Sequence, residues 1–130
     1  MSNRSQSNSR EVGEPQSALL NNAAAVSGVV GAVEGTLGPK GLNCMLVGRH
    51  GDFIISNDGR AILERMEVTH PAAKLLVRSA RAQDEAVGDG TTTACLLAGA
   101  MIAEGASLIL DGVPVSKVTE GLQLGLEEAI

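Results

Sequence analysis

The chain has 130 residues, of which 44% are hydrophobic and 19% are charged, and Phe53 is its single aromatic residue. This aliphatic content excludes a disordered chain and predicts a core built from Ala, Val, Leu and Ile. The formal net charge of −5 and the presence of only three lysines argue against nucleic acid as the main partner, because no basic stripe is available to neutralise phosphates.

Neither a membrane span nor a signal peptide is expected. No stretch approaches about 18 uninterrupted apolar residues, since the longest candidate, residues 94–110, contains Gly99, Glu104 and Gly105. The first seventeen residues lack the apolar segment of a secretory signal. The two cysteines lie outside any CxxC spacing, which favours a reducing, cytoplasmic compartment, and the two histidines are too separated for a metal cluster.

Residues 1–16 are rich in Ser, Asn and Gln, which predicts a solvated, flexible arm ahead of a folded segment, residues 17–130. A helix opens this segment, because apolar residues recur at spacings of four and three until the glycines in residues 35–38 end it. These apolar residues are Leu19, Ala23, Val26, Val30, Val33 and Leu37. Gly28 and Gly31, inside the helix, predict a close approach to a second helix.

A β-hairpin is predicted next. Two short apolar runs, residues 45–47 and 53–55, flank a glycine-containing loop at residues 48–52. An isolated two-stranded hairpin is marginally stable in water, so we expect another strand to pair with it. The turn at residues 57–59 then leads into a short helix, residues 61–66.

Three further helices complete the predicted elements. His70-Pro71 opens one that runs to about Val87, with Pro in the first turn. A long helix rich in small residues continues through residues 94–108, and after a break Ser116 is expected to cap a last helix. The apolar stripe of this last helix consists of Val118, Leu122, Leu126 and Ile130. The chain stops within it without Gly, Pro or a polar tail, so we expect the sequence to continue further.

The stretch Gly88-Asp89-Gly90-Thr91-Thr92-Thr93 joins two predicted helices. Glycines let the backbone turn with its N–H groups exposed, and the following helix start adds the positive end of its dipole. The threonine hydroxyls add donors, so phosphate binding is one interpretation. Asp89 then suits Mg²⁺, which prefers oxygen ligands and is shared with nucleotide phosphates. A plain helix N-terminus capped by Asp or Thr explains the pattern equally well.

A second glycine-rich loop, residues 35–41, and the turn at residues 57–59 also border predicted helices. The second loop is no Walker A motif, because Pro39 intervenes and no hydroxyl residue follows Lys40. The first loop is no Rossmann fingerprint, since Thr93 occupies the third glycine position and no strand precedes it. The common nucleotide-binding folds are therefore excluded.

Three motifs, in this order and spacing, resemble the TCP-1/cpn60 chaperonin family. They are Thr36-Leu37-Gly38-Pro39-Lys40-Gly41, Asn57-Asp58-Gly59 and Gly88-Asp89-Gly90-Thr91-Thr92-Thr93. The resemblance covers about residues 17–130. The run Glu67-Val68-Thr69-His70-Pro71-Ala72-Ala73-Lys74 is similar to the archaeal and eukaryotic cytosolic branch, to which the thermosomes belong, and Val33-Glu34-Gly35 is similar to the group III chaperonins.

This resemblance implies a mainly α fold with one β-hairpin, in which residues 17–130 form the N-terminal part of an ATP-binding equatorial domain. It implies Asp89 as the ligand of Mg²⁺ and Asp58 as the catalytic carboxylate that positions the attacking water. The implied nucleotide-binding residues are Thr36, Leu37, Gly38, Pro39, Asn57, Gly88, Asp89, Gly90, Thr91, Thr92 and Thr93.

The resemblance also implies a cytoplasmic chaperonin subunit that hydrolyses ATP to ADP and assists the folding of unfolded polypeptide clients. Its other partners would be further subunits in a double ring, a homo-oligomer, with neither nucleic acid nor membrane. Chaperonin subunits also contain intermediate and apical domains and a second equatorial stretch, for which this chain shows no counterpart. The alternative is a truncated chaperonin-like module that binds nucleotide or docks to rings without catalysis. Periodicity alone supports only a helical interaction domain.

Overall fold

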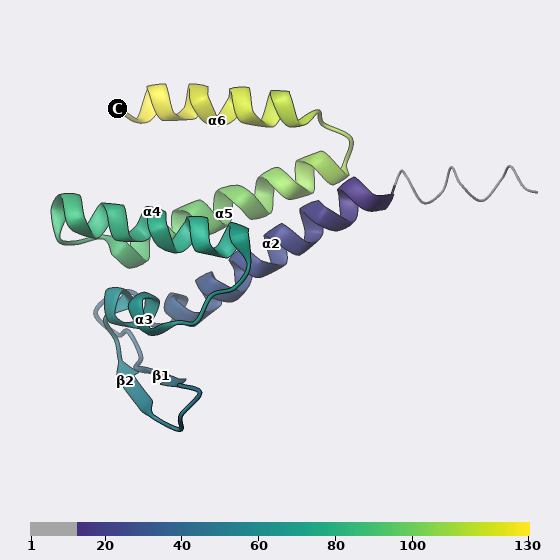
Figure 1. The fold of residues 1–130 in the computed structure, drawn as a ribbon. Coiled ribbons are helices and arrows are strands. Elements are labelled where there is room, and N and C mark those ends of the chain that lie inside the picture. Colours follow the sequence, from purple (N-terminus) through teal and green to yellow (C-terminus); the bar gives the residue numbers. More distant parts are fainter. Residues whose placement is uncertain (1–12) are drawn as a thin grey trace, which may run out of the picture.

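The structure, a computed structural model, describes residues 13–130. Within that range the chain forms five helices and one antiparallel β-hairpin (Figure 1). The elements in chain order are α2 (Gly13–Glu34), β1 (Cys44–Val47), β2 (Phe53–Ser56), α3 (Gly59–Arg65), α4 (Pro71–Val87), α5 (Thr91–Leu110) and α6 (Val115–Ala129). The mainly α fold with one hairpin is therefore confirmed.

Helix α2 begins at Gly13, four residues ahead of the folded segment that the sequence predicts. Pro15 lies in its first turn, where the missing N–H costs no hydrogen bond within the helix. Glu14, beside it, interacts favourably with the positive end of the helix dipole. The rest of the predicted arm, residues 1–12, lies outside the described residues.

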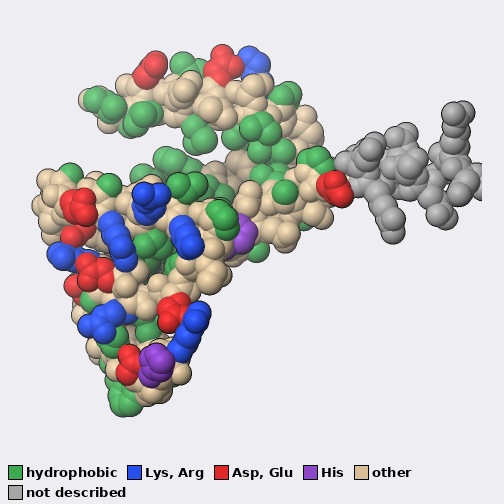
Figure 2. Space-filling view, viewed as in Figure 1, with side chains coloured by type: hydrophobic (Ala, Val, Ile, Leu, Met, Phe, Trp, Pro, Cys, Tyr) green, Lys and Arg blue, Asp and Glu red, His purple; other side chains and the backbone are tan. Residues whose placement is uncertain are grey.

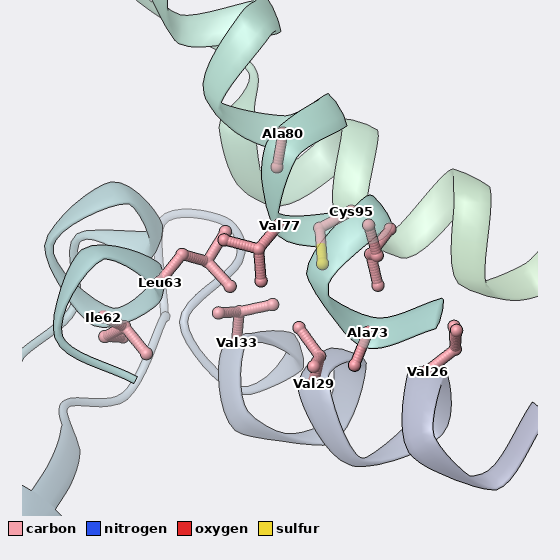
Figure 3. Packing of buried hydrophobic residues seen from close by; sticks show 10 residues of the cluster. Val26, Val29, Val33, Ile62, Leu63, Ala73, Val77, Ala80 and Cys95 are labelled. Carbon is pink, nitrogen blue, oxygen red and sulfur yellow. The ribbon is translucent and has the colours of Figure 1, made fainter. Parts of the chain in front are cut away.

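Helices α2, α4 and α5 pack against one another and enclose the core, and α3 closes one end of it (Figure 1). The side chains that meet there are small and aliphatic (Figure 3). The core residues are Val26, Val29, Val33, Ile62, Leu63, Ala73, Leu76, Val77, Ala80 and Cys95. Burial raises the pKa of the Cys95 thiol, so this residue packs as a small, protonated apolar group.

The buried face of α2 differs in part from the predicted stripe. Val26 and Val33 are buried as expected, but Val29 is buried in place of Val30, which is half-buried. Leu37 lies beyond the end of the helix and is exposed, because α2 stops at Glu34. The loop that follows supplies a hydrogen-bond donor to the end of the helix, because the N–H of Thr36 donates to the carbonyl of Val33 at 3.0 Å.

The close helix contact predicted at Gly28 and Gly31 is wrong. Both glycines face open space, with no atom within 4 Å of the position that a Cβ would take. The close contact occurs instead at Gly99 of α5, where an added Cβ would collide with the side chain of Val30. A side chain at residue 99 would therefore push α5 away from α2.

The predicted β-hairpin is present, and in its register Met45 pairs with Ile55 and Val47 pairs with Phe53. These four side chains share one face and are exposed, whereas Leu46 on the opposite face packs against the core. Within residues 13–130 no third strand joins the sheet. The additional strand expected from the marginal stability of a hairpin is therefore not supplied by the described part of the chain.

The remaining helix boundaries follow local signals. The Nδ1 atom of His70 accepts a hydrogen bond from the N–H of Ala72 at 3.2 Å and so caps α4. Ser116, predicted to cap the last helix, lies inside α6, whose N-cap is Pro114. The side chain of Pro114 has no hydrogen-bond acceptor, so no side-chain cap hydrogen bond forms there.

Helix α6 has no buried residue and contacts the rest of the chain through α5, where Gly105 faces Val118. Figure 2 shows a hollow between α6 and the rest of the molecule, with hydrophobic side chains on both of its sides. Leu122, Leu126 and Ile130, from the predicted apolar stripe, are all exposed.

By length and composition alone, α5 is a candidate membrane span, contrary to the sequence expectation, and it is the one such helix in residues 13–130. A single helix of this kind is weak support for a membrane location, because the core helix of a globular domain passes the same test. Helices α2 and α4 pack against α5 and bury Cys95 and Gly99, whereas Leu97, Met101 and Leu108 of the same helix are exposed.

Replacing Gly99 by Ala tests the contact between α2 and α5. Overpacking costs about 1–3 kcal/mol, which exceeds the gain of about 1 kcal/mol that Ala brings to a helix. Gly99→Ala is therefore expected to lower the free energy of unfolding in urea denaturation. The matched control is Gly28→Ala in open space on α2, which is expected to raise it by about 1 kcal/mol. Equal effects of the two changes would contradict this contact.

Candidate functional site

Three segments that are far apart in the sequence meet around one cavity of about 330 Å³. They are the loop after α2, the turn before α3 and the loop that joins α4 to α5. Eleven of the twelve predicted site residues line this cavity, and Pro39 does not. The lining residues are Thr36, Leu37, Gly38, Asn57, Asp58, Gly59, Arg60, Asp84, Gly88, Asp89, Gly90, Thr91, Thr92 and Thr93.

The loop between α4 and α5 turns through two glycines in the left-handed region. Gly88 has a φ of 77° and ends α4, and its N–H donates to the carbonyl of Asp84 at 2.6 Å. Gly90 has a φ of 78° and is the N-cap of α5. Glycine has no side chain to cap the helix, so the first N–H groups of α5 and the positive end of its dipole are presented to the cavity.

The three threonines at the start of α5 have different surroundings. Thr91 is buried, and its hydroxyl donates a long hydrogen bond of 3.4 Å to Oδ1 of Asp84. Thr92 lies against Gly59 at the start of α3. Thr93 is exposed. Because the hydroxyl proton of Thr91 is directed at Asp84, the hydroxyl donors that remain for a ligand are those of Thr92 and Thr93.

Asp58 is the N-cap of α3, where its Oδ1 accepts a hydrogen bond from the N–H of Arg60 at 3.0 Å. The hydroxyl of Ser56 accepts the N–H of Asp58 at 3.0 Å and fixes the turn. A carboxylate has two oxygens, so capping through Oδ1 leaves Oδ2 as an acceptor on a cavity-lining residue. The capping interpretation and a chemical role for Asp58 are thus compatible.

Asp89 is exposed at the tip of the glycine loop. Its Oδ1 accepts the N–H of Gly90 at 2.7 Å, and its carbonyl accepts a hydrogen bond from the amide of Gln83 at 3.2 Å. No group of three or more His, Cys, Asp or Glu in residues 13–130 could hold a metal ion by itself. A single carboxylate fits Mg²⁺, which takes one or two protein ligands and completes its octahedron with phosphate oxygens and water.

Two residues of the cavity wall, Arg60 and Asp84, were not identified from the sequence. Nη1 of Arg60 forms an ion pair with Oδ2 of Asp84 at 3.0 Å, and its Nε donates a hydrogen bond to Oε1 of Glu64 at 3.0 Å. The hydrogen bond to Glu64 and the charge of Asp84 raise the pKa of Arg60. The spacing of four residues between Arg60 and Glu64 is visible in the sequence. The pairing with Asp84 is not, because it joins residues on different helices.

The charge of the cavity is mixed. Three carboxylates, those of Asp58, Asp84 and Asp89, face one guanidinium, that of Arg60. The helix N-terminus favours an anion, while the exposed carboxylate of Asp89 favours a cation. This combination suits a phosphate group that arrives with a divalent ion.

A larger cavity, of about 380 Å³, lies between the hairpin and the segment that follows α3. An ion pair between Arg49 and Glu67 lies at its edge. Its lining includes the hairpin loop with Gly48 and Arg49, but no helix N-terminus, so it lacks the row of free backbone N–H groups and the helix dipole that the cavity at α5 offers to a phosphate. The cavity at α5 is therefore the candidate site.

The fold and the cavity define a class of protein: a helical module with a polar cavity at a glycine turn before a helix N-terminus, outside the parallel-sheet nucleotide folds. Residues 29–130 match the model of the TCP-1/cpn60 chaperonin family, and the chain belongs to that family. The resemblance that the three motifs carry is thereby confirmed.

Relatives and solved structures agree with this assignment. The chain is 47% identical over 120 residues to thermosome subunit alpha of Thermoplasma acidophilum, covering 92% of this chain and 22% of that protein. It is 44% identical over 112 residues to T-complex protein 1 subunit eta of Tetrahymena pyriformis, covering 86% and 20%. A crystal structure of a group III chaperonin in the open state has a TM-score of 0.83 and 53% identity, covering 87% and 23%.

The chain therefore spans about a fifth of the length of the curated relatives it matches. Its fold is that of a chaperonin equatorial-domain segment, similar to thermosomes and to the group III chaperonin. The helices and the hairpin of Figure 1 correspond to that segment.

The contact between Gly59 and Thr92 can be tested directly. An added Cβ at residue 59 would collide with the hydroxyl of Thr92, so the Thr92 side chain would have to rotate or α3 and α5 would have to separate. Gly59→Ala is expected to lower the free energy of unfolding by about 1–3 kcal/mol, measured by urea denaturation. Gly121→Ala, in open space on α6, is the control and is expected to have no destabilising effect. Unchanged stability of Gly59→Ala would show that the two helices are further apart.

Proposed function

We propose that this chain provides the phosphate-binding part of the ATP site of a chaperonin subunit, which hydrolyses ATP and assists the folding of unfolded polypeptides. One observation carries the proposal. The three motifs that resemble the chaperonin family converge on a single cavity at the uncapped N-terminus of α5, in a chain that belongs to that family. The relatives that this chain matches are named thermosome subunit alpha and T-complex protein 1 subunit eta.

The phosphates of ATP or ADP would lie against the start of α5. The N–H groups of Gly90 and the first turn and the hydroxyls of Thr92 and Thr93 donate to the phosphate oxygens. Thr91 contributes its N–H, because its hydroxyl donates to Asp84. Asn57 and the loop from Thr36 to Pro39 border the nucleotide on the side of α2 and α3. This loop is held by the hydroxyl of Thr36, which donates to the carbonyl of Val33 at 2.7 Å.

Asp89 would hold Mg²⁺ with the oxygen that is not occupied by the N–H of Gly90. The bound ion neutralises phosphate charge that develops during phosphoryl transfer. The hydrogen bonds to Gly90 and from Gln83 fix the carboxylate and the carbonyl of Asp89, so the residue is oriented before the ligand arrives.

Asp58 would orient the attacking water with Oδ2, while Oδ1 keeps α3 capped. A water held by a carboxylate is aligned for in-line attack and can give its proton to that carboxylate as its oxygen bonds to the γ-phosphorus and the bond from phosphorus to the leaving ADP oxygen breaks. Positioning and charge stabilisation account for most of the catalysis in phosphoryl transfer, so a rigid cap position is a suitable place for this carboxylate.

The proposed setting is a cytoplasmic double ring of identical subunits, with unfolded polypeptides as clients and Mg²⁺ and ATP or ADP as ligands. The exposed apolar face of the hairpin, formed by Met45, Val47, Phe53 and Ile55, supports a contact with a neighbouring subunit. A strand added to the edge of β1 or β2 would satisfy its free backbone groups and cover this face.

A second candidate function is a chaperonin-like module that binds nucleotide or docks to rings without catalysis. The observation that favours it is the capping bond of Asp58 to the N–H of Arg60, which gives this carboxylate a structural role that needs no chemistry. The two candidates differ in whether Asp58 affects turnover.

Asp89→Asn tests the metal-binding role in the protein expressed from its complete reading frame. Asn keeps an oxygen that accepts the N–H of Gly90 but lacks the charge that holds Mg²⁺. The affinity for Mg²⁺-ATP, measured by calorimetry, is expected to fall by at least about tenfold. Asp111→Asn, at the exposed far end of α5, makes the same charge change and should leave the affinity intact. An unchanged affinity in Asp89→Asn would remove Asp89 from the metal site.

Asp58→Asn separates capping from catalysis, since Asn is an equally good N-cap but a poor base. ATP affinity and the free energy of unfolding are expected to stay close to those of the wild type. The turnover number is expected to fall by about 100-fold or more, measured as phosphate release at saturating ATP. Normal turnover would favour the second candidate, in which Asp58 only caps α3.

A further inference from the structure

We propose that Arg60 is a positioning residue that neutralises Asp84 in the cavity wall and thereby sets the affinity of the site for phosphate charge. This inference rests on the proposed function, because it concerns the same cavity. Neither residue belongs to the three motifs, and the pair is formed only by the packing of α3 against α4.

Asp84 connects three helices at the wall of the cavity. It lies in the last turn of α4, and its Oδ2 pairs with Nη1 of Arg60 on α3 at 3.0 Å. Its Oδ1 accepts the hydroxyl of Thr91 on α5 at 3.4 Å. The side chain of Asp84 is only 14% exposed, so water screens its charge weakly.

The charge of Asp84 would oppose the proposed ligand. Asp58 and Asp89 are the carboxylates with proposed roles toward water and Mg²⁺, whereas Asp84 lines the same cavity without one. A weakly screened carboxylate there repels phosphate unless a cation compensates it. Arg60 is the cationic side chain among the residues that line this cavity, so its positive charge compensates the negative charge of Asp84.

The contacts of Arg60 with Glu64 and Asp84 fix the position of its guanidinium group. Its Nε donates to Oε1 of Glu64 one turn further along α3, which fixes the guanidinium plane and leaves Nη1 for Asp84. A neighbouring hollow of about 350 Å³ shares Arg60, Asp84 and Thr91 with the cavity. The ion pair therefore borders both hollows, and the side chain of Arg60 is half exposed.

The experiment measures the affinity for Mg²⁺-ATP and Mg²⁺-ADP by calorimetry in the protein expressed from its complete reading frame. Arg60→Ala is expected to weaken ATP binding by about fivefold to tenfold and ADP binding by less, because repulsion grows with ligand charge. Adding Asp84→Asn to Arg60→Ala is expected to restore ATP affinity to within about twofold of the wild type. Asn at residue 84 still offers an oxygen to the hydroxyl of Thr91.

Two further variants exclude a merely structural effect. Asp84→Asn alone is expected to tighten ATP binding, because one negative charge is removed from the cavity wall while Arg60 stays. A purely structural pair would predict weaker binding. Arg60→Lys keeps the charge without the planar fork, and its ATP affinity is expected within about threefold of the wild type. Arg65→Ala removes the same charge from the exposed last turn of α3 and serves as the matched control, with no expected change in affinity.

The outcomes are distinguishable. If Arg60→Ala weakens ATP binding and Asp84→Asn does not rescue it, Arg60 contacts the ligand directly and the positioning role is overturned. Unchanged affinity in Arg60→Ala also overturns it, while the proposed function stands on the wild-type affinity. If the wild type binds no nucleotide, both proposals fail together. Rescue by Asp84→Asn, with a larger loss for ATP than for ADP, supports the positioning role.

Discussion

The left-handed turn through Gly88 and Gly90 is the constraint on which the rest of this structure depends. It reverses the chain between α4 and α5 in three residues, so two core helices can pack side by side (Figure 1). It also leaves α5 without a side-chain cap, because the N-cap is a glycine. The same turn therefore creates the helix pair that forms the core and the exposed N–H groups that form the site.

The packing of small residues brings the other two motifs to that turn. A core made mainly of valines and alanines, with one buried cysteine, lets α2, α4 and α5 approach closely. At Gly99 the absence of a side chain leaves room for Val30 of α2. The end of α2 then lies beside the start of α5, and Gly59 brings α3 against Thr92. The cavity is a consequence of helix ends that meet, which explains why backbone groups and short polar side chains dominate its lining.

The carboxylates that line this cavity also stabilise the fold. Asp58 caps α3, Asp89 fixes the glycine turn and Asp84 links three helices, so each carboxylate has a structural contact on the described chain. A capping carboxylate has a fixed direction and a second oxygen to spare, which is what a ligand or water site requires. A helix cap and a proposed catalytic group are therefore compatible descriptions of the same side chain.

The sequence by itself determined the helix from Pro71 to about Val87, the long helix through residues 94–108, the hairpin and the three motifs, because periodicity, capping residues and glycine turns act over a few residues. Only the tertiary structure decided that Gly99, and neither Gly28 nor Gly31, forms the close helix contact, since spacing does not reveal which face meets a neighbour. The pairing of Arg60 with Asp84 likewise depends on how α3 packs against α4. Such contacts join residues distant in the chain, and no local pattern encodes them.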